Sequence, residues 1–308
     1  MKKLTLLLAG AIFITACAGN KNILNEKMAK YPADQYLTKI ASAETKKEAK
    51  ATALTDLQNI FTGLADTKNS KVRREAILTQ AKAAGSWKDK NNKKYYAIAA
   101  LQRQPALDTL AAYYPPIDNQ LSAMAKKISG ESDKYVRLKY AMAMPPLFEE
   151  REYLDSEHRI LSFDAANYNE EFFYSVKNLY NKTFYDIKIN AKIDGTDDIT
   201  VKTHLIDALN SMGFAVGEEL PTYDIALNIH TKIDKYPSET TKGLYWTRAT
   251  ATISLKDMET GGIFATFSVS ERDGSFREAE AQRRSLIAAG DKAVPLIKEK
   301  LLDYVQKK

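Results

Sequence analysis

RATATISL, Arg248–Leu255, alternates polar and apolar side chains at every position. Such a period of two is typical of a β-strand that has one face buried and the other face in water. Three further stretches, at residues 187–193, 225–232 and 263–270, repeat the alternation. We therefore expect four strands in an antiparallel sheet that is covered on one face only.

Two helical segments are available to cover this sheet. One is Val201–Met212, and the other is a long C-terminal helix from about Phe276, which Gly290 and Pro295 are expected to break or kink. The order β-α-β-β-β-α predicts a two-layer α+β domain at residues 183–308. This element order resembles the periplasmic domains of curli secretion lipoproteins and of the lipoprotein activators of penicillin-binding proteins.

The N-terminal half of the chain predicts a second, smaller α+β module. Residues 36–43 alternate as a weak strand, and Thr45 with Glu48 forms a capping-box pattern that opens an amphipathic helix. Residues 72–84 and 94–102 are the next strand candidates. The order of these elements is strand-helix-strand-strand, and a helical segment with poorer periodicity follows it.

Three features of this module carry a family resemblance: YLTKIASAETKKEAKATALTDLQ from Tyr36, then Trp87, then YYAIAALQRQPALDTL with its Arg103. Together they resemble the LPP-twenty family of bacterial lipoproteins over about residues 32–125, with Ala41-Ser42-Ala43 where that family has Gly-x-Gly. The resemblance implies an α+β module in a lipid-anchored envelope protein. The flagellar assembly protein T of some bacteria has a similar N-terminal module, so the pattern indicates a fold more than a task.

The first residues, MKKLTLLLAGAIFITAC, have the charged start and short apolar run of a secretory signal peptide. The end of that run, Ile14 to Cys17, resembles the bacterial lipobox, which implies that Cys17 is acylated and becomes the first residue of the mature chain. Several acyl chains on one residue would suffice for stable membrane anchoring. Ala18 in place of Asp implies passage to the outer membrane, with the body on its periplasmic or surface side.

The composition further limits the class of protein to which the chain can belong. The chain has 308 residues, a net charge of +6, 44% hydrophobic residues and a single cysteine. We therefore expect a well-formed hydrophobic core, no internal disulfide and no nucleic-acid partner. The expected division is a signal peptide at 1–16, a lipidated tether at 17–31, the first module at 32–103, the helical segment at 104–182 and the C-terminal domain at 183–308.

The sequence carries no recognisable catalytic or cofactor motif. His158, His204 and His230 belong to three different predicted elements, so we expect no metal site and no metal or organic cofactor. There is no Gly-x-Ser-x-Gly, Walker or Gly-x-Gly-x-x-Gly motif. We accordingly name no catalytic residue.

These observations predict a non-enzymatic, lipid-anchored envelope protein that acts as a binding or structural module. Its partners would be the membrane, through acylated Cys17, and an envelope protein or peptidoglycan. The predicted interaction face is the polar side of the sheet, with Lys188, Lys192, Arg248 and His230. Two alternatives stay open: an assembly factor of a secretion or flagellar apparatus that associates into rings, and a hydrolase whose site is assembled from distant residues.

Overall fold

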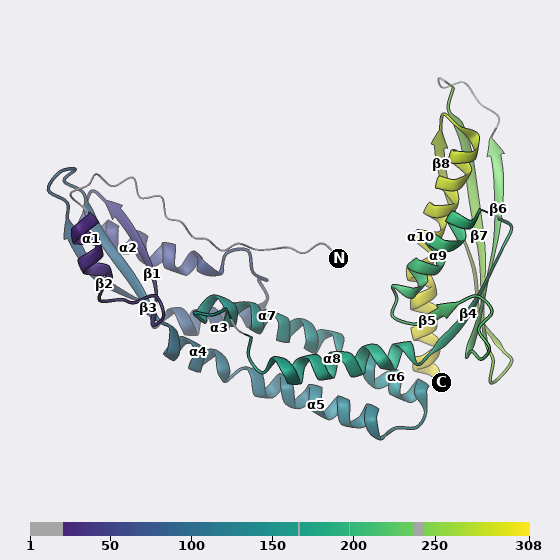
Figure 1. Ribbon diagram of the computed structural model, residues 1–308, viewed down its shortest axis with the longest axis horizontal. Helices are drawn as coiled ribbons and strands as arrows, with labels where there is room; N and C mark the ends of the chain where they lie inside the picture. Colours follow the sequence, from purple (N-terminus) through teal and green to yellow (C-terminus); the bar gives the residue numbers. More distant parts are fainter. Residues whose placement is uncertain (1–20, 166, 197, 237–242) are drawn as a thin grey trace. The chain divides into compact units, whose positions relative to one another are not determined.

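The computed structural model describes residues 21–165, 167–196, 198–236 and 243–308, and Cys17 lies outside them. The predicted α+β class is confirmed (Figure 1). The chain divides into two compact units, Met1–Ile117 with Glu150–Tyr168 and Asp118–Glu149 with Asn169–Lys308. No helix among the described residues is long and apolar enough to cross a membrane.

The N-terminal unit contains a three-stranded antiparallel sheet in the order β1-β3-β2. Helix α2 packs on it through Ala49, Ala53 and Leu57, which are fully buried against the apolar side chains of β3. The small alanines let the helix approach the sheet closely. The elements up to the sheet's last strand are α1 (Lys21–Met28), β1 (Tyr36–Ala43), α2 (Lys46–Gln58), η1 (Asn59–Phe61), α3 (Lys68–Leu78), β2 (Lys82–Lys88) and β3 (Tyr95–Gln102).

Two segments of this unit differ from the sequence-based prediction. The strand expected at residues 72–84 is wrong, because α3 ends only at Leu78 and β2 begins at Lys82. Thr67 caps α3 by accepting a hydrogen bond from the backbone N–H of Ser70, and helical spacing buries one face of α3. Residues 21–28, expected to be part of an unpatterned tether, form helix α1.

The central segment is helical, as predicted. The division between the two units falls within α5 and within α7, so each of these helices contributes residues to both. The helices are α4 (Arg103–Ala111), α5 (Tyr114–Gly130), α6 (Lys134–Met142), α7 (Pro145–Leu161) and α8 (Glu170–Tyr185).

The C-terminal unit contains a five-stranded sheet in the order β5-β4-β6-β7-β8, with α9 and α10 packed beside it (Figure 1). Strands β6, β7 and β8 are antiparallel, as predicted, but β4 runs parallel to β5 and β6. The parallel pairing of β4 with β5 follows from α9, which connects these two strands as a crossover. The elements are β4 (Lys188–Asp194), α9 (Ile199–Asn210), β5 (Ala215–Gly217), β6 (Ile225–Tyr236), β7 (Tyr245–Asp257), β8 (Ile263–Ser275) and α10 (Glu278–Lys307).

Helix α10 is continuous from Glu278 to Lys307, so a break at Gly290 or Pro295 is wrong, while the alternative of a kink there stays a prediction. A buried stripe along α10 packs against β7 and β8 and holds the helix across the proline. Gly290 has a packing role instead, because a Cβ atom there would lie 2.0 Å from Cδ2 of Leu205 in α9. The glycine therefore sets how closely the two helices approach.

Gly195, in the turn after β4, provides a test of this sheet. Its φ is +87° and an added Cβ would lie 1.9 Å from the carbonyl oxygen of Thr231, whereas Gly261 has φ +72° with nothing within 4 Å. We expect Gly195→Ala to lower the free energy of unfolding by about 3 kcal/mol, through left-handed strain and a backbone clash. Gly261→Ala should cost only about 1 kcal/mol. Equal losses in urea denaturation would contradict this assignment.

Candidate functional site

The face of the C-terminal sheet that points away from α9 and α10 carries the four residues predicted from the sequence. Lys188 and Lys192 lie on β4, His230 on β6 and Arg248 on β7, and all four side chains are exposed. Each sits between buried neighbours whose side chains point to the helices. The strand register places them on three neighbouring strands of one surface. We call this surface the open face.

Short hydroxyl side chains fill the middle of the open face on β7 and β8. The Thr250 and Ser270 hydroxyls are 2.8 Å apart, and those of Thr252 and Ser268 are 3.1 Å apart. Each pair joins directly opposed residues of the two antiparallel strands. Such cross-strand pairs stabilise the pairing of β7 with β8 and leave the remaining hydrogen-bonding capacity of the hydroxyls to solvent or to a ligand.

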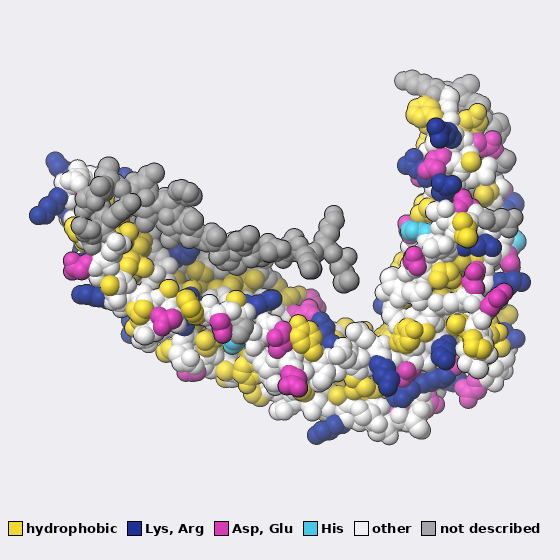
Figure 2. Space-filling view, in the orientation of Figure 1, with side chains coloured by type: hydrophobic (Ala, Val, Ile, Leu, Met, Phe, Trp, Pro, Cys, Tyr) yellow, Lys and Arg dark blue, Asp and Glu magenta, His cyan; other side chains and the backbone are white. Residues whose placement is uncertain are grey.

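Three further basic residues lie on the open face but were not named from the sequence: Lys232, Lys256 and Arg272. They follow from the same alternation that identified Arg248, so the sequence did contain the signal. In Figure 2, Lys and Arg side chains recur along the edge of the C-terminal unit where its strands lie. The two acidic residues on the face, Asp194 and Asp234, do not balance these cations.

Local contacts hold some of these charges in place. Lys232 Nζ lies 2.8 Å from Asp234, and Lys192 Nζ lies 3.8 Å from Asp194. The hydrogen bond that Lys232 donates to Asp234, with the charge of that carboxylate, raises the pKa of Lys232. At one end of the face the Arg272 guanidinium lies 4.7 Å from the ring centroid of Trp246. The open face therefore combines a positive field, hydroxyls and the aromatic ring of Trp246.

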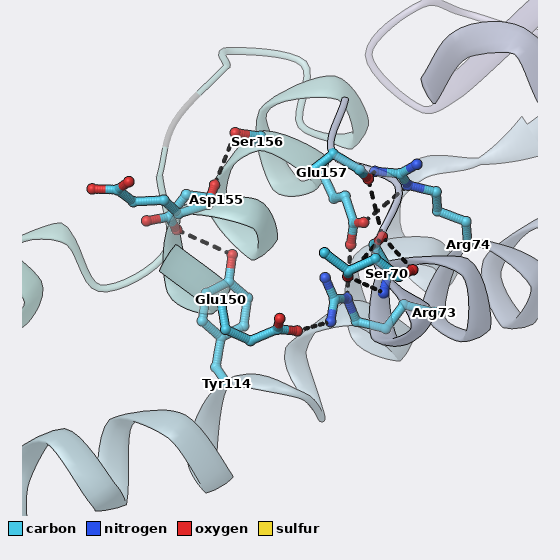
Figure 3. Close-up of polar contacts among 11 residues, drawn as sticks. Ser70, Arg73, Arg74, Tyr114, Glu150, Asp155, Ser156 and Glu157 are labelled. Carbon is cyan, nitrogen blue, oxygen red and sulfur yellow. Dashed lines mark hydrogen bonds and ion pairs between the residues drawn. The ribbon is translucent and has the colours of Figure 1, made fainter. Parts of the chain in front are cut away.

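The N-terminal unit contains a different group of charges, buried between α3 and α7 (Figure 3). The two oxygens of Glu157, which is fully buried, accept hydrogen bonds from Arg73 Nε at 2.9 Å and Arg74 Nε at 3.0 Å. Arg73 also pairs with Glu150. Burial acts to lower the pKa of Arg73, but the hydrogen bonds and charges of Glu157 and Glu150 outweigh it and raise that pKa.

A second buried ion pair lies near the first, on α7. Arg151 is completely buried, pairs with Asp155 and lies with its guanidinium carbon 4.2 Å from the ring centroid of Tyr114. The Tyr114 hydroxyl donates a hydrogen bond of 3.2 Å to Asp155 (Figure 3). Because arginines and a tyrosine already occupy these carboxylates, the contacts assign them to packing. They are not placed as a general acid and base would need to be.

The three histidines lie in separate surroundings. His158 in α7 is edge-on to Tyr114 at 6.3 Å, His204 Nε2 lies 2.7 Å from Asp291 Oδ1, and His230 is on the open face. Within the described part of the chain, no group of three or more His, Cys, Asp or Glu side chains could hold a metal ion.

The end of α10 is tied to the turn between β7 and β8 through Asp257. One carboxylate oxygen of this buried residue accepts hydrogen bonds from Tyr304 at 2.6 Å and Lys308 at 2.9 Å. The other accepts from the backbone N–H groups of Glu259 and Thr260. Burial acts to raise the pKa of Asp257, but these four donors lower it to about 2. The charged carboxylate therefore stabilises the helix end against the sheet.

The hydrogen bonds to the Asp257 carboxylate predict that stability depends on pH. Because the folded pKa of Asp257 is below its unfolded value of about 4, its contribution is complete above about pH 4 and disappears as the pH falls towards 2. We expect Asp257→Asn to cost on the order of 2 kcal/mol in urea denaturation at pH 7 and much less at pH 2. The exposed Glu299→Gln should change little at either pH. A loss of unfolding free energy in Asp257→Asn that does not vary with pH would contradict stabilisation by the charged carboxylate.

Comparison with known proteins gives no family: neither a protein family nor a curated protein matches the sequence. A secreted protein of Helicobacter pylori is similar at 16% identity and TM-score 0.33, over 87% of this chain and 98% of its own. A minor lipoprotein of Acinetobacter baumannii is similar at 11% identity and TM-score 0.29, over 38% of this chain and 91% of its own. A lipoprotein of Neisseria meningitidis is similar at 14% identity and TM-score 0.25, over 35% of this chain and 98% of its own. Such low scores carry no conclusion about this chain.

Proposed function

We propose that this chain is a lipid-anchored, non-enzymatic binding module of the cell envelope, and that its open face binds peptidoglycan, whose sugars carry hydroxyl groups and whose stem peptides carry carboxylates. The observation that carries the proposal is the chemistry of the open face. Every outward residue of β7 from Arg248 to Lys256, and of β8 from Thr266 to Arg272, is Ser, Thr, Lys or Arg. A basic, hydroxyl-rich surface is complementary to a polymer that carries both hydroxyl and carboxylate groups.

The same surface favours a glycan over a protein as the partner. The centres of protein–protein interfaces are depleted in charge and enriched in large apolar and aromatic side chains. Among the described side chains on the open-face positions of β7 and β8, the large apolar ones lie towards the strand ends, at Trp246 and Ile263. Between them lie hydroxyls and charges, which suit the polar edges of sugar rings. An envelope protein as partner is the alternative that the binding experiment separates.

The anchor is the second part of the proposal. Cys17, at the end of the lipobox-like segment, would hold the chain to the outer membrane, and only three residues separate it from the start of α1 at Lys21. Four residue steps reach at most about 14 Å. The N-terminal unit would therefore stand next to the lipid headgroups, with no long tether between them.

The anchor is tested by intact mass and membrane fractionation in a Gram-negative host, with Cys17→Ala beside the wild type. We expect the wild type to lose residues 1–16, gain the mass of a diacylglyceryl and a further acyl group, and sediment with outer membrane. The variant should lack the lipid mass and leave the membrane fraction. A wild-type chain that is soluble and carries a free thiol would overturn the anchor.

The glycan partner is tested by co-sedimentation of the chain, without residues 1–17, with purified peptidoglycan sacculi. We expect the double variant Lys192→Glu/Arg248→Glu to bind at least about tenfold more weakly, because it reverses two charges of the open face. Lys46→Glu/Lys47→Glu, on exposed positions of α2, makes the same net charge change and should bind as the wild type does.

Two outcomes would contradict the glycan assignment. Equal weakening by both double variants would mean that net charge, and not the open face, drives adsorption. No binding of the wild type to sacculi, together with cross-links from the open face to an envelope protein, would replace the glycan with a protein partner. The assembly-factor alternative differs from both, because it predicts a ring-sized particle of this chain alone in solution.

A further inference from the structure

A cavity of about 580 Å³ is formed by residues of the N-terminal unit. It is bounded by the start of β1, the junction of β3 with α4, and the residues that follow α7. Its volume is in the range of small-molecule sites in proteins. The side chains that matter for its chemistry are Asp34, Tyr36, Gln102, Arg103, Phe163 and Asp164.

Arg103 is held in this cavity by backbone carbonyl groups. Its Nε donates to the carbonyl oxygen of Ala33 at 2.7 Å, and its Nη1 donates to those of Leu161 at 2.5 Å and Ile160 at 3.4 Å. These bonds fix the guanidinium from both sides of the cavity. Within the described residues, the two N–H donors of Nη2 have no partner. One end of a rigid guanidinium is therefore available to a ligand.

The charge of Arg103 is not neutralised by an ion pair with any described residue. Burial lowers the pKa of the Arg103 guanidinium, and the charge of Asp34 only partly offsets that shift. An arginine side chain nevertheless stays protonated in a protein. A half-buried guanidinium in this state gains most from a carboxylate, which matches its planar donors. Two carboxylates, Asp34 and Asp164, line the same cavity.

An aromatic ring stands at the edge of the cavity. Phe163 is 64% exposed, and its ring centroid lies 5.8 Å from the guanidinium carbon of Arg103. The exposed face of this ring is a flat apolar surface for a ligand that also contacts the arginine. Across the cavity, the Tyr36 hydroxyl accepts a hydrogen bond of 3.1 Å from Gln102. The site thus offers the cation of Arg103, the carboxylate of Asp34 and an apolar surface at Phe163.

We propose that this cavity binds an amino-acid zwitterion, a group with an ammonium and a carboxylate on one carbon. The ligand carboxylate pairs with Nη2 of Arg103, its ammonium with Asp34, and its side chain covers Phe163. A simple anion would be repelled by Asp34, and a simple cation by Arg103, so a ligand with both charges satisfies the site best. The zwitterion can be a free amino acid or the diamino-acid end of a peptidoglycan peptide.

The test is calorimetric titration of the chain without residues 1–17 with three compounds: phenylalanine, phenylalanine amide and N-acetylphenylalanine. Phenylalanine should bind with a dissociation constant of about 1 mM or lower, and each derivative at least about tenfold more weakly, because each lacks one charge. No heat of binding for phenylalanine at about 10 mM would overturn the proposal, and so would equal binding of the amide or the acetylated compound.

Variants at exposed positions locate the site without disturbing the fold. Phe163→Ala should weaken phenylalanine binding by about tenfold, while Phe276→Ala, a ring 73% exposed in the other unit, should not. Asp34→Asn should weaken binding of phenylalanine but not the residual binding of N-acetylphenylalanine, which has no ammonium group. Equal effects of Phe163→Ala and Phe276→Ala would place the ligand elsewhere.

The same titration separates the two sources of the zwitterion. Meso-diaminopimelate and a muramyl tripeptide that ends in it both present the group. Tighter binding of the tripeptide would identify a cell-wall peptide, and equal or weaker binding a free amino acid. The outcome is independent of sacculus binding by the open face, because the residues of the cavity lie in the other unit.

Discussion

The C-terminal unit depends on one constraint: its sheet can be covered by helices on a single face. Ala249, Ala251, Ile253 and Leu255 of β7 all point to that face and are buried against the layer that α10 forms. Their burial contributes the largest favourable term to this layer. The approach of α9 to α10 at Gly290 belongs to the same packing. With every large apolar side chain in the middle of β7 directed inward, the opposite face is left to hydroxyls and charges, and it becomes a surface for a polar partner.

The interior of the N-terminal unit is held together by buried charges as well as by apolar packing. The contacts of Glu157 with Arg73 and Arg74 join residues more than 80 positions apart, between α3 and α7. A buried pair of this kind is weak as a source of stability but strong as a constraint, because losing one partner leaves an unpaired charge in the interior. The strand predicted over residues 72–84 was wrong because Thr67 caps a helix there, and one face of that helix is buried. The side chain of Arg73 is buried by a distant partner, which local alternation cannot show.

Prediction succeeded where a local period decides the structure and failed where tertiary contacts do. The strands around Arg248 and Ile225 were predictable because their alternation is itself the cause of the one-sided sheet. The parallel direction of β4 was not, since a strand has the same alternation in either direction. Four residues of the open face were predicted by the same period, and Lys232, Lys256 and Arg272 could have been added by it. The cavity at Arg103 could not have been found, because its walls come from three separate parts of the chain.

The measurement that tests the central claim most directly is acylation of lysine amines, read by mass spectrometry, with and without bound sacculi. If the open face binds the glycan, Lys188, Lys192, Lys232 and Lys256 become protected when sacculi are present, while Lys46 and Lys47 on α2 react as before. The same protection of both groups would show adsorption of the whole surface. Protection on α2 with an unchanged open face would contradict the account.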